Sequence, residues 1–295
     1  MKTLVSRRGF LKTAAVAGAA ASTTEAIEQQ AAASPSNDKP ALRIGIMTYT
    51  LGKDWDQETL IKNCQEAQWE HAELRTTHAH GVEVSLSKSQ RGEVRKRFED
   101  GGIKLSLASA FAYHWEDPGK LREHIEGTKE YTLLAHDIGA LGIRVFPNAL
   151  PTDKDSVEKT LAQIGRAAAE VATFASDYGV EIRLSNHGKG TNSVPVIRRI
   201  LDYADCEHLY MNWNCDRTDV EDPGFEENFN SVKDRIRNIH LHDLTDEEYP
   251  YRKLFALLRE ANYAGYCDAE VDQSCEAVKF MQYYRALFLA LQNEL

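Results

Sequence analysis

Eight short runs of strand-forming residues, each followed by a longer stretch with helical spacing, constrain the fold of this chain more than any other feature. Strands and helices that alternate in this order indicate a parallel sheet covered by helices. Eight is also the number of strands that closes such a sheet into a barrel. The predicted strands are Leu42–Thr48, Glu70–Arg75, Ile103–Ala108, Gly142–Phe146, Val180–Ser185, His208–Trp213, Arg237–His242 and Tyr266–Val271.

The segments between these strands carry apolar residues three and four positions apart, which is typical of amphipathic helices. The clearest stripe runs through Val157, Leu161, Ile164, Ala168 and Val171. Glycines stand where several helices are expected to end, and glycine tolerates the left-handed conformation that closes a helix. These junctions are predicted at Gly101-Gly102, Gly139, Gly179 and Gly265.

An open, doubly wound sheet is the alternative architecture for the same alternation of strands and helices. The first strand lacks the glycine-rich loop that binds dinucleotides, and the eight units are regular. A length of 295 residues suits either one large barrel or two small domains, and no domain boundary is evident after residue 41. We therefore expect a single α/β domain at 41–295, a (β/α)8 TIM barrel without a nucleotide cofactor.

The N-terminal segment has the composition of an export signal rather than of a folded domain. The arginine pair Arg7-Arg8 precedes the apolar run Thr13–Ala21, which has no polar face and is too short to span a bilayer. The alternative, an amphipathic N-terminal helix, would need such a face. This pattern is similar to a twin-arginine signal, so we predict a signal peptide at 1–33 and a linker at 34–40. The mature protein is then expected to be periplasmic or otherwise exported, with no stable membrane anchor.

The charge of the chain restricts its partners. The net charge is −10 and the isoelectric point about 5.5, and an acidic surface repels nucleic acid, whose binding requires clustered Lys and Arg. We expect a small-molecule partner and no nucleic acid. The sequence leaves the oligomeric state open.

Polar residues gather at the ends of the predicted strands, although strands of a parallel barrel are normally apolar on both faces. Side chains two positions apart point the same way along a strand, and the active sites of TIM barrels lie at the carboxyl ends of the strands. Single residues of this kind are often solvated or salt-bridged, but six strands share the pattern. The residues are Glu73, Arg75, Arg144, Arg183, Ser185, His187, Asn212, Asn214, His240, His242, Asp268 and Glu270.

Four of these strand ends carry motifs in the order and spacing of a known superfamily. Glu73-Leu74-Arg75, Asn186-His187-Gly188, Ile239–Asp243 and Gly265–Glu270 resemble the xylose-isomerase-like sugar isomerase/epimerase TIM barrels. The resemblance covers essentially all of residues 41–295 and implies a small carbohydrate substrate. Because that superfamily includes isomerases, epimerases, dehydratases and endonucleases, the resemblance specifies the fold more closely than the reaction. The acidic charge argues against an endonuclease.

The resemblance also implies one divalent metal, held by residues at the ends of the fifth to eighth strands. His240 and Glu270 match that set, but Asn214 stands in place of an aspartate and Ser185 in place of a glutamate. The loss of two anionic ligands weakens the attraction for a hard cation such as Mg²⁺ or Mn²⁺. A set of His187, Asn214, His240 and Glu270 would suit Zn²⁺ better. We expect either a site of this kind or no metal at all.

The same substitutions bear on the mechanism. Epimerisation with two bases needs groups on both faces of the reacting carbon, and with Ser185 in place only Glu270 clearly remains. We expect Glu270 to be the base for proton transfer next to a sugar carbonyl, with His240 stabilising the negative charge that develops. Glu73 is a candidate second base from a strand further round the barrel. The alternatives are a keto-sugar lyase and a barrel that has lost its activity and only binds a sugar.

Other polar and aromatic residues are candidates for substrate contact. The guanidinium groups of Arg75, Arg144 and Arg183 can bind an anionic substrate. Alternatively, they can pair with Glu73 and Glu181 as structural bridges. Trp115 can stack on a sugar ring, or it can close the barrel top together with His114 as an aromatic plug. The candidate substrate-binding residues are Arg75, His114, Trp115, Arg144, Arg183, His187 and His242.

Overall fold

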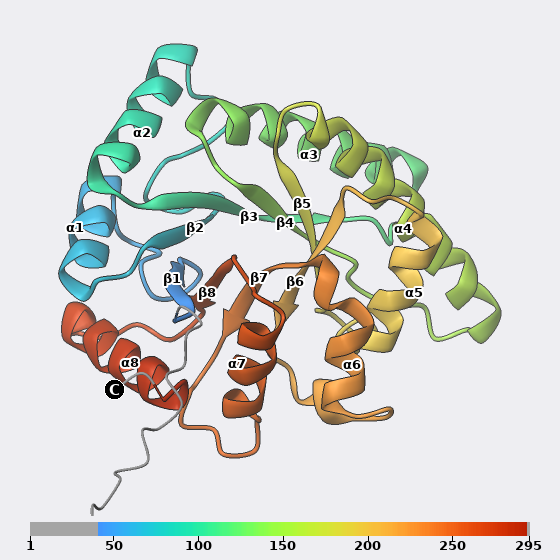
Figure 1. Cartoon of the computed structure of the whole chain (residues 1–295). Helices are drawn as coiled ribbons and strands as arrows, with labels where there is room; N and C mark the ends of the chain where they lie inside the picture. The colour runs from blue at the N-terminus through green and yellow to red at the C-terminus, as the bar shows by residue number, and fades with distance from the viewer. Residues whose placement is uncertain (1–40, 294–295) are drawn as a thin grey trace, which may run out of the picture. The chain divides into compact units, whose positions relative to one another are not determined.

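The computed structural model describes residues 41–293, and these form a closed barrel of parallel strands surrounded by helices (Figure 1). The strands are β1 (Arg43–Met47), β2 (His71–Arg75), β3 (Lys104–Ala112), β4 (Gly142–Phe146), β5 (Glu181–Ser185), β6 (Leu209–Asn214), β7 (Ile236–Leu241) and β8 (Tyr266–Ala269). The helices are α1 (Gln57–Ala67), α2 (Lys88–Gly101), α3 (Pro118–Ile138), α4 (Lys154–Ser176), α5 (Val194–Ala204), α6 (Phe225–Val232), α7 (Tyr251–Glu260) and α8 (Ala277–Leu291). Two 3-10 turns, η1 (Arg217–Val220) and η2 (Lys233–Arg235), flank α6.

The predicted (β/α)8 barrel is confirmed. Each strand pairs in parallel with the next along the chain, and β8 pairs with β1 to close the sheet. The predicted strand boundaries agree within two residues, except at the end of β3. That strand continues to Ala112, with a shift of register against β4 after Ala108. The predicted signal peptide and linker, residues 1–40, lie outside the described residues.

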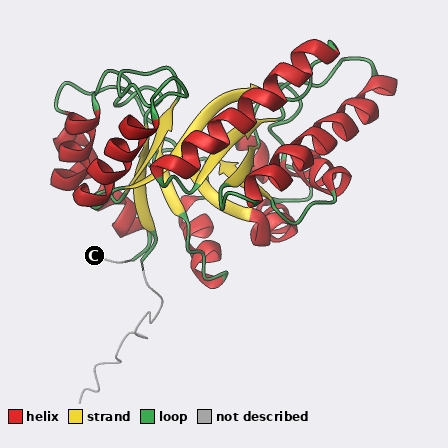
Figure 2. Ribbon diagram, turned by 90° about the horizontal axis from the view of Figure 1, so that it is seen from above, coloured by secondary structure: helices red, strands yellow, loops and turns green. Residues whose placement is uncertain are grey.

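The helices lie around the outside of the strands, as Figure 2 shows from above. The predicted stripe on α4 is buried at Leu161, Ile164, Ala168 and Val171. Two predicted glycine junctions, Gly102 and Gly139, are left-handed C-caps. Gly179 is left-handed as well, beyond the last residues of α4. Within the described part of the chain, no helix is long and apolar enough to cross a membrane.

The prediction for Gly265 was wrong. Helix α7 ends at Glu260, and the left-handed residue after it is Asn262, with φ 54°. Asparagine is one of the few residues besides glycine that adopt this conformation readily. Gly265 serves another purpose, because a side chain there would collide with the hydroxyl of Tyr263 and the carbonyl oxygen of Arg237. It permits close packing at the start of β8.

The outer face of the barrel wall is apolar, whereas the inside is polar along its whole length. Residues such as Ile143, Ile182, Leu209 and Ile239 are completely buried. The side chains of the polar interior are also almost inaccessible to solvent, so they must find hydrogen-bond partners inside the barrel. They include His71, Glu73, Ser106, Arg144, Arg183, Asn212, Asn238, His240 and Asp268.

Candidate active site at the carboxyl ends of the strands

A buried histidine between two glutamates forms the centre of the site. His240, near the end of β7, donates from Nε2 to Glu73 of β2 at 2.5 Å. Its Nδ1 lies 3.2 Å from Glu270, the residue that follows β8. Glu73 is fully buried, whereas the side chain of Glu270 is 22% exposed. With a carboxylate at each ring nitrogen, the imidazole carries both protons and is held in one orientation.

The two carboxylates determine the charge of the histidine. Burial alone would lower the pKa of His240, but the charge of Glu73 and the hydrogen bonds to Glu270 and Glu73 raise it to about 9. Burial would raise the pKa of Glu270, yet the hydrogen bond and the charge of His240, together with Arg144, lower it to about 2. The pKa of Glu73 is also lowered, because His240 outweighs the effect of burial. Near neutral pH the centre is therefore an imidazolium between two carboxylates.

Arg144 of β4 supplies a second buried cation. Its guanidinium lies 4.0 Å from the centre of the Phe146 ring, and it donates to the carbonyl oxygen of Ser109 at 3.2 Å. Within the described residues, its Nε has no hydrogen-bond partner. Glu73 and Glu270 both favour its charged form, against the effect of burial. Two cations thus face two carboxylates, and one guanidinium N–H remains to be satisfied.

Ser185 and Asn214 lie where the resemblance implies two further carboxylates. Ser185 is 1% exposed and accepts a hydrogen bond from Asn212 at 3.1 Å. The amide oxygen of Asn214 lies 3.2 Å from Nε2 of His242. Asn186 fixes the backbone of Asn214 on both sides, by accepting from its N–H at 2.7 Å and donating to its carbonyl at 2.9 Å. Both replacement residues are therefore integrated into hydrogen bonds with their neighbours.

A divalent metal does not fit these donors as they are arranged. Both ring nitrogens of His240 face carboxylates, and Asn214 is engaged by His242. A metal-binding imidazole must present an unprotonated nitrogen, and Mg²⁺ and Mn²⁺ prefer several carboxylate oxygens. Within residues 41–293, no group of three His, Cys, Asp or Glu side chains is placed to hold a metal ion.

A cleft of about 500 Å³ borders the site beside Glu270 and His242. Its opposite wall is formed by Phe280, Tyr283 and Leu287 of α8. Pockets that bind small molecules commonly have volumes of about 300–1,000 Å³ and a mainly apolar lining. The cleft therefore offers space for a small ligand next to Glu270.

Three predicted substrate-contact residues lie around the mouth. His187 is exposed at the end of β5, with its ring 4.8 Å from that of Phe146. Although the residue is exposed as a whole, partial burial of its ring and the charge of Arg144 lower the pKa of His187. His114 and Trp115 line a second cleft, of about 490 Å³, between the loops after β3 and β4. Their rings lie 4.3 Å apart, and neither His114 Nδ1 nor Trp115 Nε1 has a hydrogen-bond partner within the described residues.

Three charged residues of the candidate set are engaged by other parts of the protein or buried. Arg183 lies in the middle of β5 and binds Glu181 at 2.6 and 2.9 Å, so its side chain forms the structural bridge that was the alternative to substrate contact. Arg75 donates to the carbonyl and hydroxyl of Thr76 and is not paired with Glu73. Glu73, the candidate second base, is fully buried and contacts Nε2 of His240, which favours a role in positioning that histidine.

Sequence analysis missed Asn238, which links the centre to the deeper interior of the barrel. Its side-chain amide lies 2.9 Å from Asp268 and 3.4 Å from Glu73. The sequence could have indicated this residue, because Asn238 stands two positions before His240 and every second side chain of a strand points to the same face. Ser109, which accepts from Arg144 through its backbone, had no such signal.

Comparison with solved structures shows the same fold in several sugar-converting enzymes. An L-ribulose 3-epimerase has 16% identity and a TM-score of 0.71, over 86% of this chain and 95% of its own. A 3-keto-D-glucoside 4-epimerase from E. coli has 14% identity and a TM-score of 0.67, over 85% and 99%. The IolI protein, described with a bound zinc atom, has 16% identity and a TM-score of 0.63, over 85% and 98%. At these identities the similarity establishes the fold alone.

Comparison with families of sequences identifies the family of this chain. No curated protein sequence matches the chain significantly. A family model described as the xylose isomerase-like TIM barrel matches residues 61–287, which is most of the barrel. The match contains every residue of the Glu73–His240–Glu270 centre. The chain therefore belongs to the xylose isomerase-like TIM barrel family.

Proposed function

We propose that this protein is a sugar isomerase/epimerase-like enzyme that transfers a proton next to the carbonyl group of a small carbohydrate. The observation that carries the proposal is the alignment of Glu73, His240 and Glu270, which holds an ionised carboxylate beside a fixed imidazolium at the mouth of the barrel. The family and the sugar epimerases among its structural neighbours support the same class of reaction.

In this proposal Glu270 accepts the carbon-bound proton. Its Oε2 faces His240, so Oε1 is the atom directed to substrate. A carboxylate whose pKa is about 2 is a weak base, so most of the catalytic effect must come from stabilising the enediolate that forms. The imidazolium of His240 and the guanidinium of Arg144 are the two cations near that charge. No step is assigned to a metal, because the donors do not fit one.

The distribution of carboxylates favours one-base chemistry. Glu270 is the carboxylate at the centre with exposed surface, while Glu73 is buried and Ser185 offers only a hydroxyl that Asn212 already engages. Aldose–ketose isomerisation needs a single base and an electrophile, and so does β-elimination from a keto-sugar. A keto-sugar lyase is therefore the second candidate. A barrel that only binds a sugar is the third, on the ground that Ser185 and Asn214 replace carboxylates.

The test is incorporation of solvent deuterium into a panel of keto-sugars and aldoses, followed by NMR. The enzyme proposal requires exchange at the carbon next to a carbonyl, and it requires Glu270→Gln to reduce this exchange about 10²–10⁴-fold. Glu227→Gln, an exposed position on α6, is the matched control and is expected to keep full activity. Binding of a sugar without exchange by the unaltered protein would favour the binding barrel.

We also propose that the protein is exported by the twin-arginine pathway, on the basis of Arg7-Arg8 and the apolar run that follows. Fractionation of cells that express the full chain is expected to place it outside the cytoplasm. The variant with Lys at both positions 7 and 8 is expected to remain inside. Equal export of both forms would contradict this proposal.

A further inference from the structure

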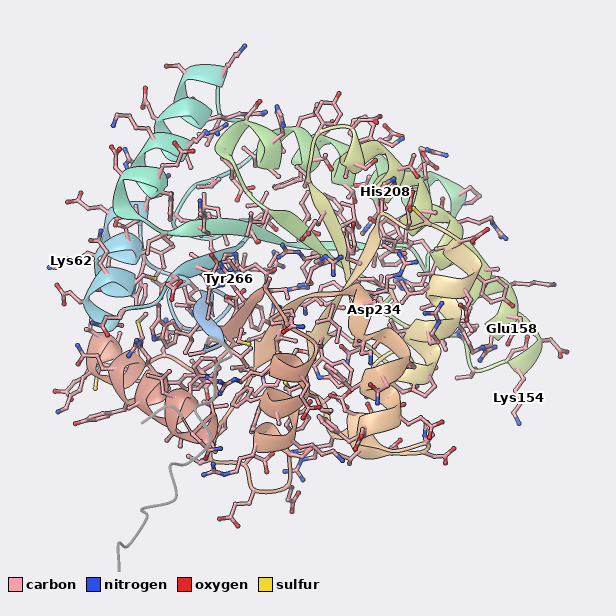
Figure 3. All side chains as sticks on the ribbon, in the orientation of Figure 1. Lys62, Lys154, Glu158, His208, Asp234 and Tyr266 are labelled. Carbon is pink, nitrogen blue, oxygen red and sulfur yellow. The ribbon has the colours of Figure 1, made fainter. Side chains whose placement is uncertain are left out.

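A cavity of about 930 Å³ lies at the end of the barrel opposite the candidate active site. It is bordered by residues that begin five of the strands, among them Arg43 of β1, Lys104 of β3, Glu181 of β5 and Tyr266 of β8. Tyr266 and Asp234, both labelled in Figure 3, mark the borders formed by β8 and η2. Nothing in the proposed reaction uses this cavity.

The charge of the cavity is opposite to that of the chain. Four cations, Arg43, Lys104, Arg183 and Arg237, border it at the strand starts, although the chain as a whole has a net charge of −10. Two carboxylates border it as well. Glu181 binds Arg183 at 2.6 Å and lies 3.5 Å from Arg237, and Asp234 stands on the η2 side. Within the described residues, Arg43 and Lys104 form no ion pair. The cations therefore outnumber the carboxylates that could neutralise them.

Two of these cations are held in place before any ligand arrives. The guanidinium of Arg43 lies 4.1 Å from the centre of the Tyr266 ring and donates to its hydroxyl at 3.1 Å. The guanidinium of Arg237 lies 4.2 Å from the centre of the Tyr210 ring. Stacking on an aromatic ring restricts an arginine side chain without neutralising it, so less conformational freedom is lost when an anion binds.

We propose that this cavity binds a polyvalent oxyanion of the phosphate class. Arginine guanidinium groups present parallel N–H donors that match phosphate oxygens, and a lysine adds a mobile point charge. An anion among the four cations would also relieve their mutual repulsion, which the two carboxylates Glu181 and Asp234 do not cancel. The occupant is either inorganic phosphate or the phosphate group of a small metabolite, since the cavity exceeds the size of the free ion.

The test is a calorimetric titration of the full chain with inorganic phosphate, at an ionic strength matched with chloride. We expect one phosphate per chain. Arg43→Gln and Lys104→Gln are each expected to weaken binding about tenfold, and Arg43→Lys to weaken it less. Lys154→Gln is the matched control, an exposed lysine at the start of α4 that is labelled in Figure 3, and it is expected to bind as the unaltered chain does. Repeating the titration with glycerol phosphate distinguishes the free ion from a phosphomonoester.

Three results would overturn the proposal. The first is the absence of heat beyond dilution at tens of millimolar phosphate. The second is equal binding by Arg43→Gln, Lys104→Gln and Lys154→Gln, which would indicate general screening. The third is binding that is lost in Arg144→Gln and unchanged in Arg43→Gln, which would place the anion in the candidate active site. Because the readout is binding, the result does not depend on the proposed sugar chemistry.

Discussion

The two ends of this barrel differ in how far their cations are balanced by carboxylates. At the carboxyl end, two buried cations, His240 and Arg144, face two carboxylates, Glu73 and Glu270, so the charges are matched within the protein. At the amino end, Arg183 and Arg237 share Glu181, whereas Arg43 stacks on a ring instead of pairing with an acid. A centre that is neutral by itself can polarise a neutral sugar, whereas an end with surplus positive charge suits an anion.

A continuous series of polar contacts joins the two ends through the barrel. Asn238 touches both Glu73 and Asp268, and Asp268 lies 2.7 Å from Nδ1 of His71. The other ring nitrogen of His71 lies 2.9 Å from Ser106, which accepts from Arg183 at 3.0 Å. Buried polar groups of this kind are stable only when each has partners. The interior is therefore a connected network of polar side chains, and removing one member exposes what the others contribute.

The largest effect on stability is expected from removing the cation at the carboxyl end. His240→Leu leaves Glu73 and Glu270 without the imidazolium between them, and breaking a buried ion pair costs about 3–5 kcal/mol. Urea unfolding followed by circular dichroism measures the free energy of unfolding. His208→Leu is the control, because the side chain of His208 is 44% exposed and lies outside the centre; the residue is labelled in Figure 3. Equal stability of the two variants would show that His240 is not charged in the folded protein.

A smaller effect, on the pH dependence, is expected from Glu73→Gln. The pKa of His240 in the folded protein is about 9, above its ordinary value of 6.5, so its stabilising charge is fully present below pH 6.5 and is lost as the pH rises through 9. Without the charge of Glu73, this alkaline decline should begin at lower pH, by roughly one unit. Activity near neutral pH is expected to fall about tenfold.

The measurement for Glu73→Gln is the pH profile of kcat/KM together with the free energy of unfolding at several pH values. A residue that only fills space would change the height of the activity profile and not the position of its alkaline limb. An unchanged limb in a folded variant would therefore show that Glu73 does not set the charge of His240.

The fold could be predicted from the sequence because its signals are local. Alternating runs such as Gly142–Phe146 and helical stripes such as that of α4 depend on neighbours a few positions away, and both are confirmed. The residues of the centre could be located as well, since polar positions at strand ends must meet at one end of a barrel. Their pairing could not, because Glu73 and His240 are 167 positions apart in the chain.

The dependence on contacts between distant positions also explains why Arg183 differs from its expected role. Arg144 and Arg183 are paired in register on neighbouring strands, but the guanidinium of Arg183 turns back to Glu181 and Ser106, whereas that of Arg144 lies beside the centre. The direction of a long side chain depends on the partners that it finds inside the closed barrel, and a single strand carries no signature of them. Asn262 could replace glycine after α7 because either residue satisfies the backbone there.

The smallest effect on turnover is expected from removing divalent metals. This experiment tests whether the charges at the carboxyl end are balanced within the protein, unlike those at the amino end. If the carboxyl end is neutral within the protein, a cation from solution has no role there, and EDTA should change turnover less than twofold. Elemental analysis of the purified protein should then find no stoichiometric Zn²⁺, Mn²⁺ or Mg²⁺. The double variant Ser185→Glu, Asn214→Asp adds the two carboxylates that these metals prefer and is expected to bind one of them. Loss of turnover with EDTA, restored by one metal, would show instead that His240 turns a nitrogen toward a metal and leaves one of its glutamates.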